Sequence, residues 1–320
     1  MANMKLTGSN IKLNRHYLFF IILFVIAIYV ILPQLKVFHS SWDLLLHPNY
    51  NWILVGLLFT AATYLTGALT YCLLAFKKLN YWITVTVQLA AMFINRILPG
   101  GIGALGVNFL YLRKMKHTVA QSTSVLAINN ILGLIGHLLL VIILLRFSTS
   151  DQALPRDREI SKSAIAITLI VLALVVSAGI FIRRGKIFKF LIDLRDNILS
   201  YKRRPINLIA ALGSSLILTL SNVICLFCCA QALNVHLPFV ALLIIFSFGL
   251  GTSTAIPTPG GLGGFEAGLT GGLVAYHIPS SLALSVALLY RLVSYWIPLI
   301  VGAIAFIVVE KRRLLTSESG

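Results

Sequence analysis

Long apolar stretches separated by short polar connections run along most of the chain. A helix needs roughly 20 predominantly apolar residues to cross about 30 Å of hydrocarbon. Six uninterrupted stretches meet that length with help from their flanks, at residues 17–32, 52–76, 119–145, 163–182, 206–233 and 282–309. The pattern therefore predicts six full membrane spans.

Two further apolar stretches, residues 81–110 and 239–276, are each interrupted by prolines and glycines. The first contains Leu-Pro-Gly-Gly-Ile-Gly at 98–103, and the second contains Pro-Thr-Pro-Gly-Gly-Leu-Gly at 257–263. Both motifs read Pro-Gly-Gly-apolar-Gly. Proline ends a helix because it has no N–H to donate, and glycine permits a tight turn. Each stretch is therefore predicted to form two helices joined by a turn.

Lysine and arginine concentrate in alternate connections. They occur near the N-terminus and then at 77–78, 113–116, 183–204 and 311–313. The positive-inside rule places these segments, and with them both termini, on the cytoplasmic side of the cell (inner) membrane. Each interrupted stretch then begins and ends on one side, which predicts two re-entrant hairpins entering from opposite faces. The alternative is that each interrupted stretch forms two short complete spans.

The expected elements fall into two sets of the same order, a long helix, a hairpin and a long helix. The sets cover residues 52–145 and 206–309, and their predicted orientations are opposite. Inverted repeats whose broken helices meet near the middle of the bilayer are typical of secondary transporters. The sequence thus predicts an all-α polytopic membrane protein with an inverted-topology repeat, forming a single transmembrane domain over residues 1–320.

Composition excludes a soluble domain. Hydrophobic residues make up 58% of the chain, charged residues make up 11%, and the mean hydropathy is +0.93. The net charge of +17 comes from basic residues in the connections, so it reports topology and attraction to anionic lipids. No nucleic-acid partner is expected.

Catalytic and metal-binding patterns are missing from the sequence. The four cysteines lie in apolar runs without histidine or carboxylate at ligand spacing, so packing is their expected role. No nucleophile–base set, nucleotide-binding motif or zinc-protease motif occurs. We expect neither enzymatic activity nor a cofactor.

The candidate site combines the two glycine motifs with three charged residues in apolar surroundings, Arg96, Glu266 and Arg291. Such charges are costly in a bilayer and usually functional. A helix start carries roughly half a positive charge and attracts phosphate, so we expect unpaired N–H groups at both turns. The expected substrate-binding residues are Arg96, Gly100, Gly101, Gly103, Pro259, Gly260, Gly261, Gly263, Glu266 and Arg291.

The roles of these residues remain open at this point. In one hypothesis Arg96 and the N–H groups hold a phosphate, while Glu266 and Arg291 position the turn or contact a headgroup amine. In the alternative, Glu266 and Arg291 form only a buried structural pair.

The residues around the second motif resemble a known family. Residues 257–263, Glu266-Ala267, Ala283 and Arg291 are similar to the transmembrane region of lysylphosphatidylglycerol synthase (multiple peptide resistance factor), and residues 96–103 resemble its first-half motif. The likeness covers essentially the whole chain, although Asn129-Asn130 stand where the family often has a Glu-Arg pair. The resemblance implies a flippase for aminoacylated phosphatidylglycerol, with the translocation part alone in this chain.

The expected function is movement of a phospholipid, or of another polyprenyl- or glycerol-linked phosphate, between leaflets. Two alternatives stay open: a small-solute transporter coupled to H⁺ or another ion through Glu266, and a non-transporting scaffold. A lateral opening favours lipid, a closed aqueous cavity favours solute, and dense packing around Glu266 favours the scaffold. Membrane phospholipids are the expected partners, whereas a homo-oligomer and a separate lipid-modifying enzyme stay open.

Overall fold

The computed structural model describes residues 48–98, 101–147, 204–255 and 258–315, together with residues 195, 197, 199 and 201. Helices joined by turns make up these described residues, and no strand occurs among them. The predicted spans 17–32 and 163–182 lie outside the described residues, as does Gly100 of the first motif.

Four long apolar helices of the described part are of sufficient length and composition to cross a membrane. They correspond to four of the predicted spans. Three of them are α3 (Tyr50–Leu74), α6 (Val119–Phe147) and α9 (Pro205–Ala232). The fourth consists of α12 (Ser280–Arg291), the π-helical segment η2 (Leu292–Trp296) and α13 (Ile297–Lys311) in direct succession.

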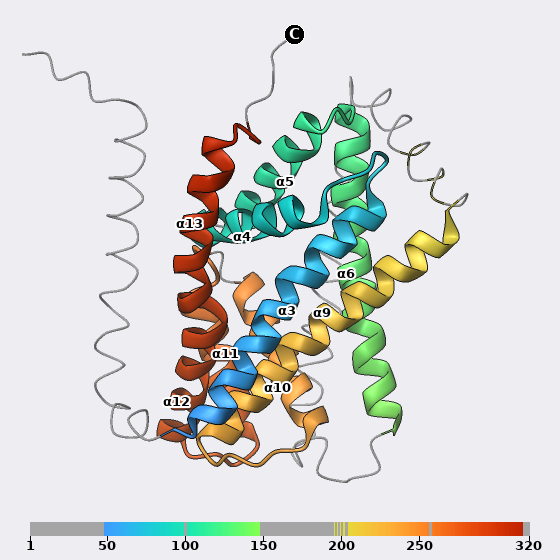
Figure 1. Cartoon of the computed structure of the whole chain (residues 1–320). Coiled ribbons are helices and arrows are strands. Elements are labelled where there is room, and N and C mark those ends of the chain that lie inside the picture. Colours follow the sequence, from blue (N-terminus) through green and yellow to red (C-terminus); the bar gives the residue numbers. More distant parts are fainter. Residues whose placement is uncertain are drawn as a thin grey trace, which may run out of the picture. The chain divides into compact units, whose positions relative to one another are not determined.

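Each interrupted stretch forms two helices, as the motifs predict. The first gives α4 (Tyr81–Ile97) and α5 (Ile102–Lys114), and the second gives α10 (Phe239–Ala255) and α11 (Gly264–Ala275). In Figure 1, α4 and α5 lie in the upper half and α10 and α11 in the lower half.

Glycine allows the two helices of each pair to approach closely. A Cβ at Gly103 would lie 2.6 Å from backbone atoms of Ile94, and a Cβ at Gly268 would lie 2.7 Å from the Cα of Gly249. Both distances are far shorter than a normal carbon contact, so larger residues would force the paired helices apart.

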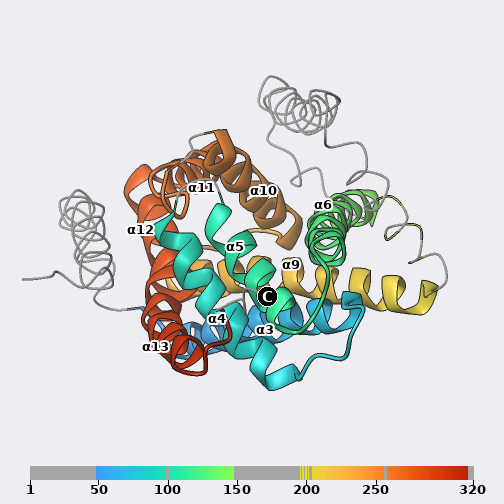
Figure 2. The same cartoon turned by 90° about the horizontal axis from the view of Figure 1, so that it is seen from above.

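The helices α3 and α9 run side by side along their length (Figures 1 and 2). Small and hydroxyl-bearing residues mediate the contact, because they let helix backbones come close and can bond across the interface. Thr60 Oγ1 and Cys225 Sγ lie 3.3 Å apart, and Ser214 Oγ donates to the carbonyl of Thr66 at 2.8 Å. Cys225, Cys228 and Cys229 are free and buried, in agreement with their predicted packing role.

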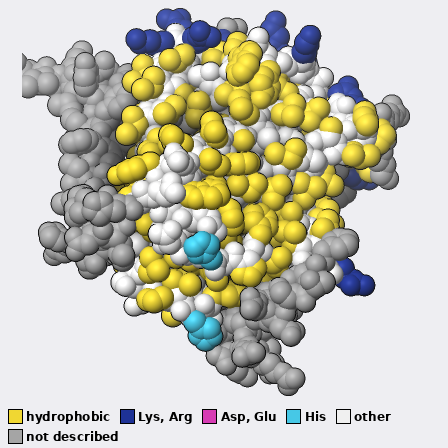
Figure 3. Space-filling model, turned by 60° about the horizontal axis from the view of Figure 1, so that its bottom comes forward, with side chains coloured by type: hydrophobic (Ala, Val, Ile, Leu, Met, Phe, Trp, Pro, Cys, Tyr) yellow, Lys and Arg dark blue, Asp and Glu magenta, His cyan; other side chains and the backbone are white. Residues whose placement is uncertain are grey.

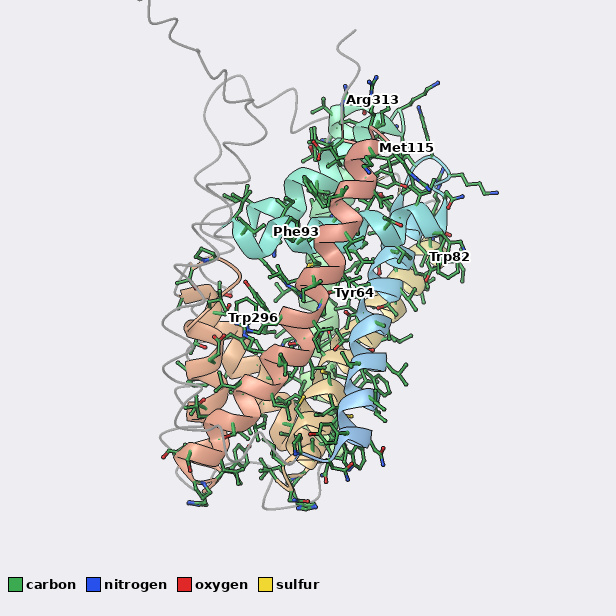
Figure 4. All side chains as sticks on the ribbon, turned by 60° about the vertical axis from the view of Figure 1, so that its left-hand side comes forward. Tyr64, Trp82, Phe93, Met115, Trp296 and Arg313 are labelled. Atoms are coloured by element: carbon green, nitrogen blue, oxygen red, sulfur yellow. The ribbon has the colours of Figure 1, made fainter. Side chains whose placement is uncertain are left out.

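Apolar and basic side chains occupy different parts of the surface. Figure 3 shows apolar side chains over most of one face, with most of the visible lysine and arginine side chains along its upper rim and a few at its right-hand side. Figure 4 places Met115 and Arg313 together at one end, with Tyr64 and Trp296 about midway along the described part. Lys77 Nζ also donates to the carbonyl of Lys116, which joins two of the basic connections. These segments therefore share an end, as expected for a helical membrane protein.

Candidate functional site

A cavity of about 570 Å³ lies where the two proline–glycine turns meet. Gly101 of the first turn and Gly260 and Gly261 of the second line the same space, although they are distant in sequence. The remaining lining residues come from α4, α9, α10, α11, α12, η2 and the adjoining turns: Met92, Asn95, Arg96, Asn222, Phe246, Leu250, Ser253, Thr254, Thr258, Phe265, Tyr290, Arg291, Ser294 and Tyr295.

Arg96, in the last turn of α4, is buried and binds the π-helical segment. Its guanidinium donates to the carbonyl of Tyr295 at 2.6 Å and to the carbonyl of Ser294 at 2.7 Å. In a regular helix the Ser294 carbonyl would accept from residue 298, but Pro298 has no N–H. A third bond, to the hydroxyl of Tyr64 at 3.0 Å, completes this arrangement. The arginine therefore donates to a carbonyl whose regular helical donor the proline removes.

Arg291 and Glu266 form a buried ion pair, with Nε and Oε1 2.9 Å apart. Arg291 also donates through Nη2 to the carbonyl of Gly261 at 2.9 Å, and its guanidinium lies 4.5 Å from the ring centroid of Phe265. The pairing that the sequence suggested is present, and it fixes the second turn against α12.

The starts of α5 and α11 both receive a side-chain oxygen. Glu266 Oε2 accepts from the N–H of Gly263 at 2.8 Å, and Asn95 Oδ1 accepts from the N–H of Ala104 at 3.3 Å. The expectation of unpaired N–H groups at both turns was therefore wrong for these two groups. The physical reason is that a buried helix start without a cap is costly, and each motif has a polar side chain within reach.

Tyr295 connects the two halves of the site. The guanidinium carbons of Arg96 and Arg291 lie 4.8 Å and 5.1 Å from its ring centroid. The ring also packs on Gly260, where a Cβ would lie 2.5 Å from the tyrosine hydroxyl oxygen. Sequence reasoning missed Tyr295, although its position four residues after Arg291 was an available signal, since such residues share a helix face.

Half of the expected binding residues line the cavity, namely Arg96, Gly101, Gly260, Gly261 and Arg291. Glu266, Gly263 and Pro259 do not line the cavity, and the N–H of Gly263 donates to the carboxylate of Glu266. Gly103 packs against α4 instead. Besides Tyr295, sequence reasoning missed the lining polar residues Asn222 and Ser253, whose types are common in membrane helices and carry no distinguishing local pattern.

The arrangement suits binding of an anion. Two guanidinium groups face the cavity, and Glu266 neutralises one of them from behind. The hydrogen bonds of Arg96 go to two neutral carbonyls and a hydroxyl. The described lining therefore carries one net positive charge, and the guanidinium groups of Arg96 and Arg291 are themselves largely shielded from solvent, which strengthens their attraction for an anion.

Comparison with known proteins gives a family match over most of the chain. The model of the lysylphosphatidylglycerol synthase TM region matches residues 17–302. A UPF0104 membrane protein of Methanocaldococcus jannaschii is 27% identical over 233 residues, which cover 70% of this chain and 97% of that relative. A UPF0104 membrane protein of Pyrococcus horikoshii is 27% identical over 127 residues, covering 40% of this chain and 37% of the relative.

Proposed function

This chain belongs to the lysylphosphatidylglycerol synthase TM region family, and we propose that it moves phospholipids or other lipids with an anionic phosphate between the two leaflets of the membrane. The observation that carries the proposal is the cavity with net positive charge at the meeting point of the two turns. A lipid phosphate is the membrane group that this charge attracts most directly.

Arg96 is the proposed phosphate-binding residue. A guanidinium has five N–H donors in a planar fork. Three hydrogen bonds to Tyr64, Ser294 and Tyr295 fix the orientation of the fork while the residue still lines the cavity. We propose that the N–H groups not used in these three bonds donate to a phosphate oxygen. Hydrogen bonds between charged groups are roughly twice as strong as bonds between neutral ones.

We further propose that α4–α5 and α10–α11 are re-entrant hairpins of an inverted repeat. The helices α5 and α11 have 13 and 12 residues, which correspond to about 20 Å and about 18 Å of helix. Both are too short to cross about 30 Å of hydrocarbon. With the spans 17–32 and 163–182 the architecture has six full spans, and the basic end of Figure 3 then faces the cytoplasm together with both termini.

The site argues against the two alternatives. A proton-coupled solute transporter would need Glu266 to bind and release protons, but its carboxylate holds both the N–H of Gly263 and the guanidinium of Arg291. A scaffold would need dense packing around this region, and a cavity of about 570 Å³ adjoins Arg291 instead.

Reconstitution tests the proposal. The full chain is inserted into phosphatidylcholine vesicles doped with a fluorescent phosphatidylglycerol, and a membrane-impermeant quencher is added. We expect the protein to expose inner-leaflet dye that empty vesicles protect, and Arg96→Gln to slow this exposure about tenfold or more, because the variant lacks the charge-assisted contact to the phosphate. Lys78→Gln, which removes an exposed charge at the basic end, serves as the matched control. Vesicles with folded protein that protect the dye as well as empty vesicles would contradict the proposal.

A further inference from the structure

The polar residues that line the cavity indicate which lipid headgroup it can bind, in addition to the phosphate. We infer that the preferred ligand is a phosphate ester whose remaining polar groups are uncharged hydroxyls, as in a glycerol or sugar headgroup, and that an aminoacyl headgroup with cationic amines is disfavoured. The inference rests on the proposed function, because it concerns the ligand of the same cavity.

The charge of the cavity lining disfavours a cationic headgroup. None of the described residues that line the cavity is acidic. Glu266 lies behind Arg291, and both of its oxygens are directed to protein groups. The described lining carries one net positive charge, which the phosphate of the ligand compensates. A further cationic amine would find no carboxylate among the described lining residues and would lie near two guanidinium groups, and such like-charge juxtaposition is unfavourable.

Neutral polar side chains of the lining suit hydroxyl groups. Asn95 and Asn222 line the cavity from α4 and α9, and Ser253 lines it from α10. The Oδ1 of Asn95 accepts from the N–H of Ala104, which directs its amide hydrogens to other acceptors. Asn222 donates through Nδ2 to the carbonyl of Leu218 at 3.0 Å, which leaves its Oδ1 as an acceptor. Three elements thus offer both donors and acceptors, the combination that a hydroxyl group requires.

Binding of defined short-chain lipids tests the inference. The detergent-purified full chain is titrated with dioctanoyl forms of phosphatidylglycerol and lysylphosphatidylglycerol, and each Kd is measured by thermophoresis. We expect phosphatidylglycerol to bind about tenfold more tightly or better, in line with the cost of an unpaired charge. Equal or tighter binding of the lysyl lipid would overturn the inference and leave lipid translocation intact. If neither lipid binds and neither crosses the vesicle membrane, the proposed function itself fails, and the inference fails with it.

A substitution that adds a carboxylate gives an independent test. Asn222→Asp places an acid at the cavity wall with almost no change of shape. Asn207→Asp makes the same change on α9, where Asn207 donates to the carbonyl of Leu73 and does not line the cavity. We expect Asn222→Asp to shift the ratio of the two Kd values toward the lysyl lipid about fivefold or more, and Asn207→Asp to leave the ratio unchanged. Equal shifts in both variants, measured on monodisperse protein, would refute the headgroup assignment.

Discussion

Arg96 and Tyr295 bond to each other in both directions. The guanidinium of Arg96 donates to the carbonyl of Tyr295 at 2.6 Å, and the hydroxyl of Tyr295 donates to the carbonyl of Arg96 at 3.2 Å. Arg96 lies in the last turn of α4 and Tyr295 lies in η2, so the reciprocal pair joins the first helix pair to the last long helix. A ligand that binds Arg96 would therefore exert force on both α4 and η2.

Replacing Arg96 with lysine separates its charge from its geometry. An ammonium keeps the positive charge but cannot span the carbonyls of Ser294 and Tyr295 as a planar fork does. We expect Arg96→Lys to lower the free energy of unfolding by about 1–3 kcal/mol, because a buried acceptor loses its partner. Thermal unfolding of the purified protein measures the change.

Comparison of Arg96→Lys with Arg96→Gln distinguishes a role of Arg96 in phosphate binding from a purely structural role. Arg96→Lys is expected to retain more lipid exchange than Arg96→Gln, since only the glutamine variant removes the charge. If the two variants exchange lipid at the same reduced rate, the contribution of Arg96 is structural and the phosphate assignment is wrong.

Gly260 is predicted to be intolerant of any side chain. Its φ of +60° disfavours L-residues, and a Cβ would lie 2.5 Å from the hydroxyl oxygen of Tyr295. Gly263 has a φ of +83°, yet a Cβ there meets no heavy atom within 4 Å. We expect Gly263→Ala to cost about 1 kcal/mol from backbone strain alone, and Gly260→Ala to cost clearly more, as measured by unfolding temperature.

The Tyr295 contact can be isolated by a double-mutant cycle. In a Tyr295→Ala background the ring is missing, so the cost of Gly260→Ala should fall to about that of Gly263→Ala. An unchanged cost in that background would show that the backbone conformation, and not the ring, makes glycine necessary.

Glu266 and Arg291 are predicted to stabilise the second turn as a unit. Removing one member of a buried ion pair leaves an uncompensated charge and typically costs about 3–5 kcal/mol. Glu266→Gln should therefore lower the unfolding temperature, while its amide oxygen still accepts from the N–H of Gly263. The double variant Glu266→Gln with Arg291→Met removes both charges, and we expect it to unfold at a higher temperature than Glu266→Gln alone.

These variants also decide between the two roles that the sequence left open for Glu266. Loss of lipid exchange at an unchanged unfolding temperature would assign the carboxylate a direct role in transport. Parallel loss of exchange and stability in Glu266→Gln is the outcome that the geometry predicts.

Periodicity and charge predicted the helices of the described part well, because burial in hydrocarbon imposes length and polarity directly on the sequence. The last span, predicted at residues 282–309, is present as one continuous helical stretch, but the sequence did not indicate the π-helical segment inside it. Pro298 leaves the carbonyl of Ser294 without its helical donor, and the helix widens at η2. A proline near a helix start is compatible with either outcome, so the sequence alone could not distinguish them.

The charged residues of the candidate site could be predicted from the sequence, but their hydrogen-bond partners could not. Arg96, Glu266 and Arg291 stand out because charges are rare in apolar stretches. Their partners do not, since Tyr295 and the carbonyl of Ser294 are about two hundred positions from Arg96 and meet it only through tertiary packing. The caps on α5 and α11 were missed for a similar reason, because the choice of acceptor depends on the turn geometry.

His117, in the connection between α5 and α6, predicts a loss of stability in mild acid. Its Nε2 accepts from the backbone N–H of Lys77 at 3.1 Å, and its Nδ1 lies 3.1 Å from the carbonyl of Leu112. These partners require the neutral ring with the proton on Nδ1, because protonated Nε2 could not accept. Burial is the largest cause that lowers the pKa of His117, and the nearby charge of Lys77 lowers it further, whereas backbone hydrogen bonds oppose the shift.

The sign of the effect follows from this lowered pKa. The unfolded chain, with a histidine pKa of about 6.5, binds this proton more readily than the folded protein does. Stability is therefore retained at neutral pH, declines as the pH falls below that value, and stops declining below the folded-state pKa. Unfolding temperatures of the wild type and of His117→Gln, measured between pH 7.5 and pH 5, check this expectation. The wild type should lose more stability than the variant over that interval, and curves that stay parallel would show that His117 binds its proton equally in both states.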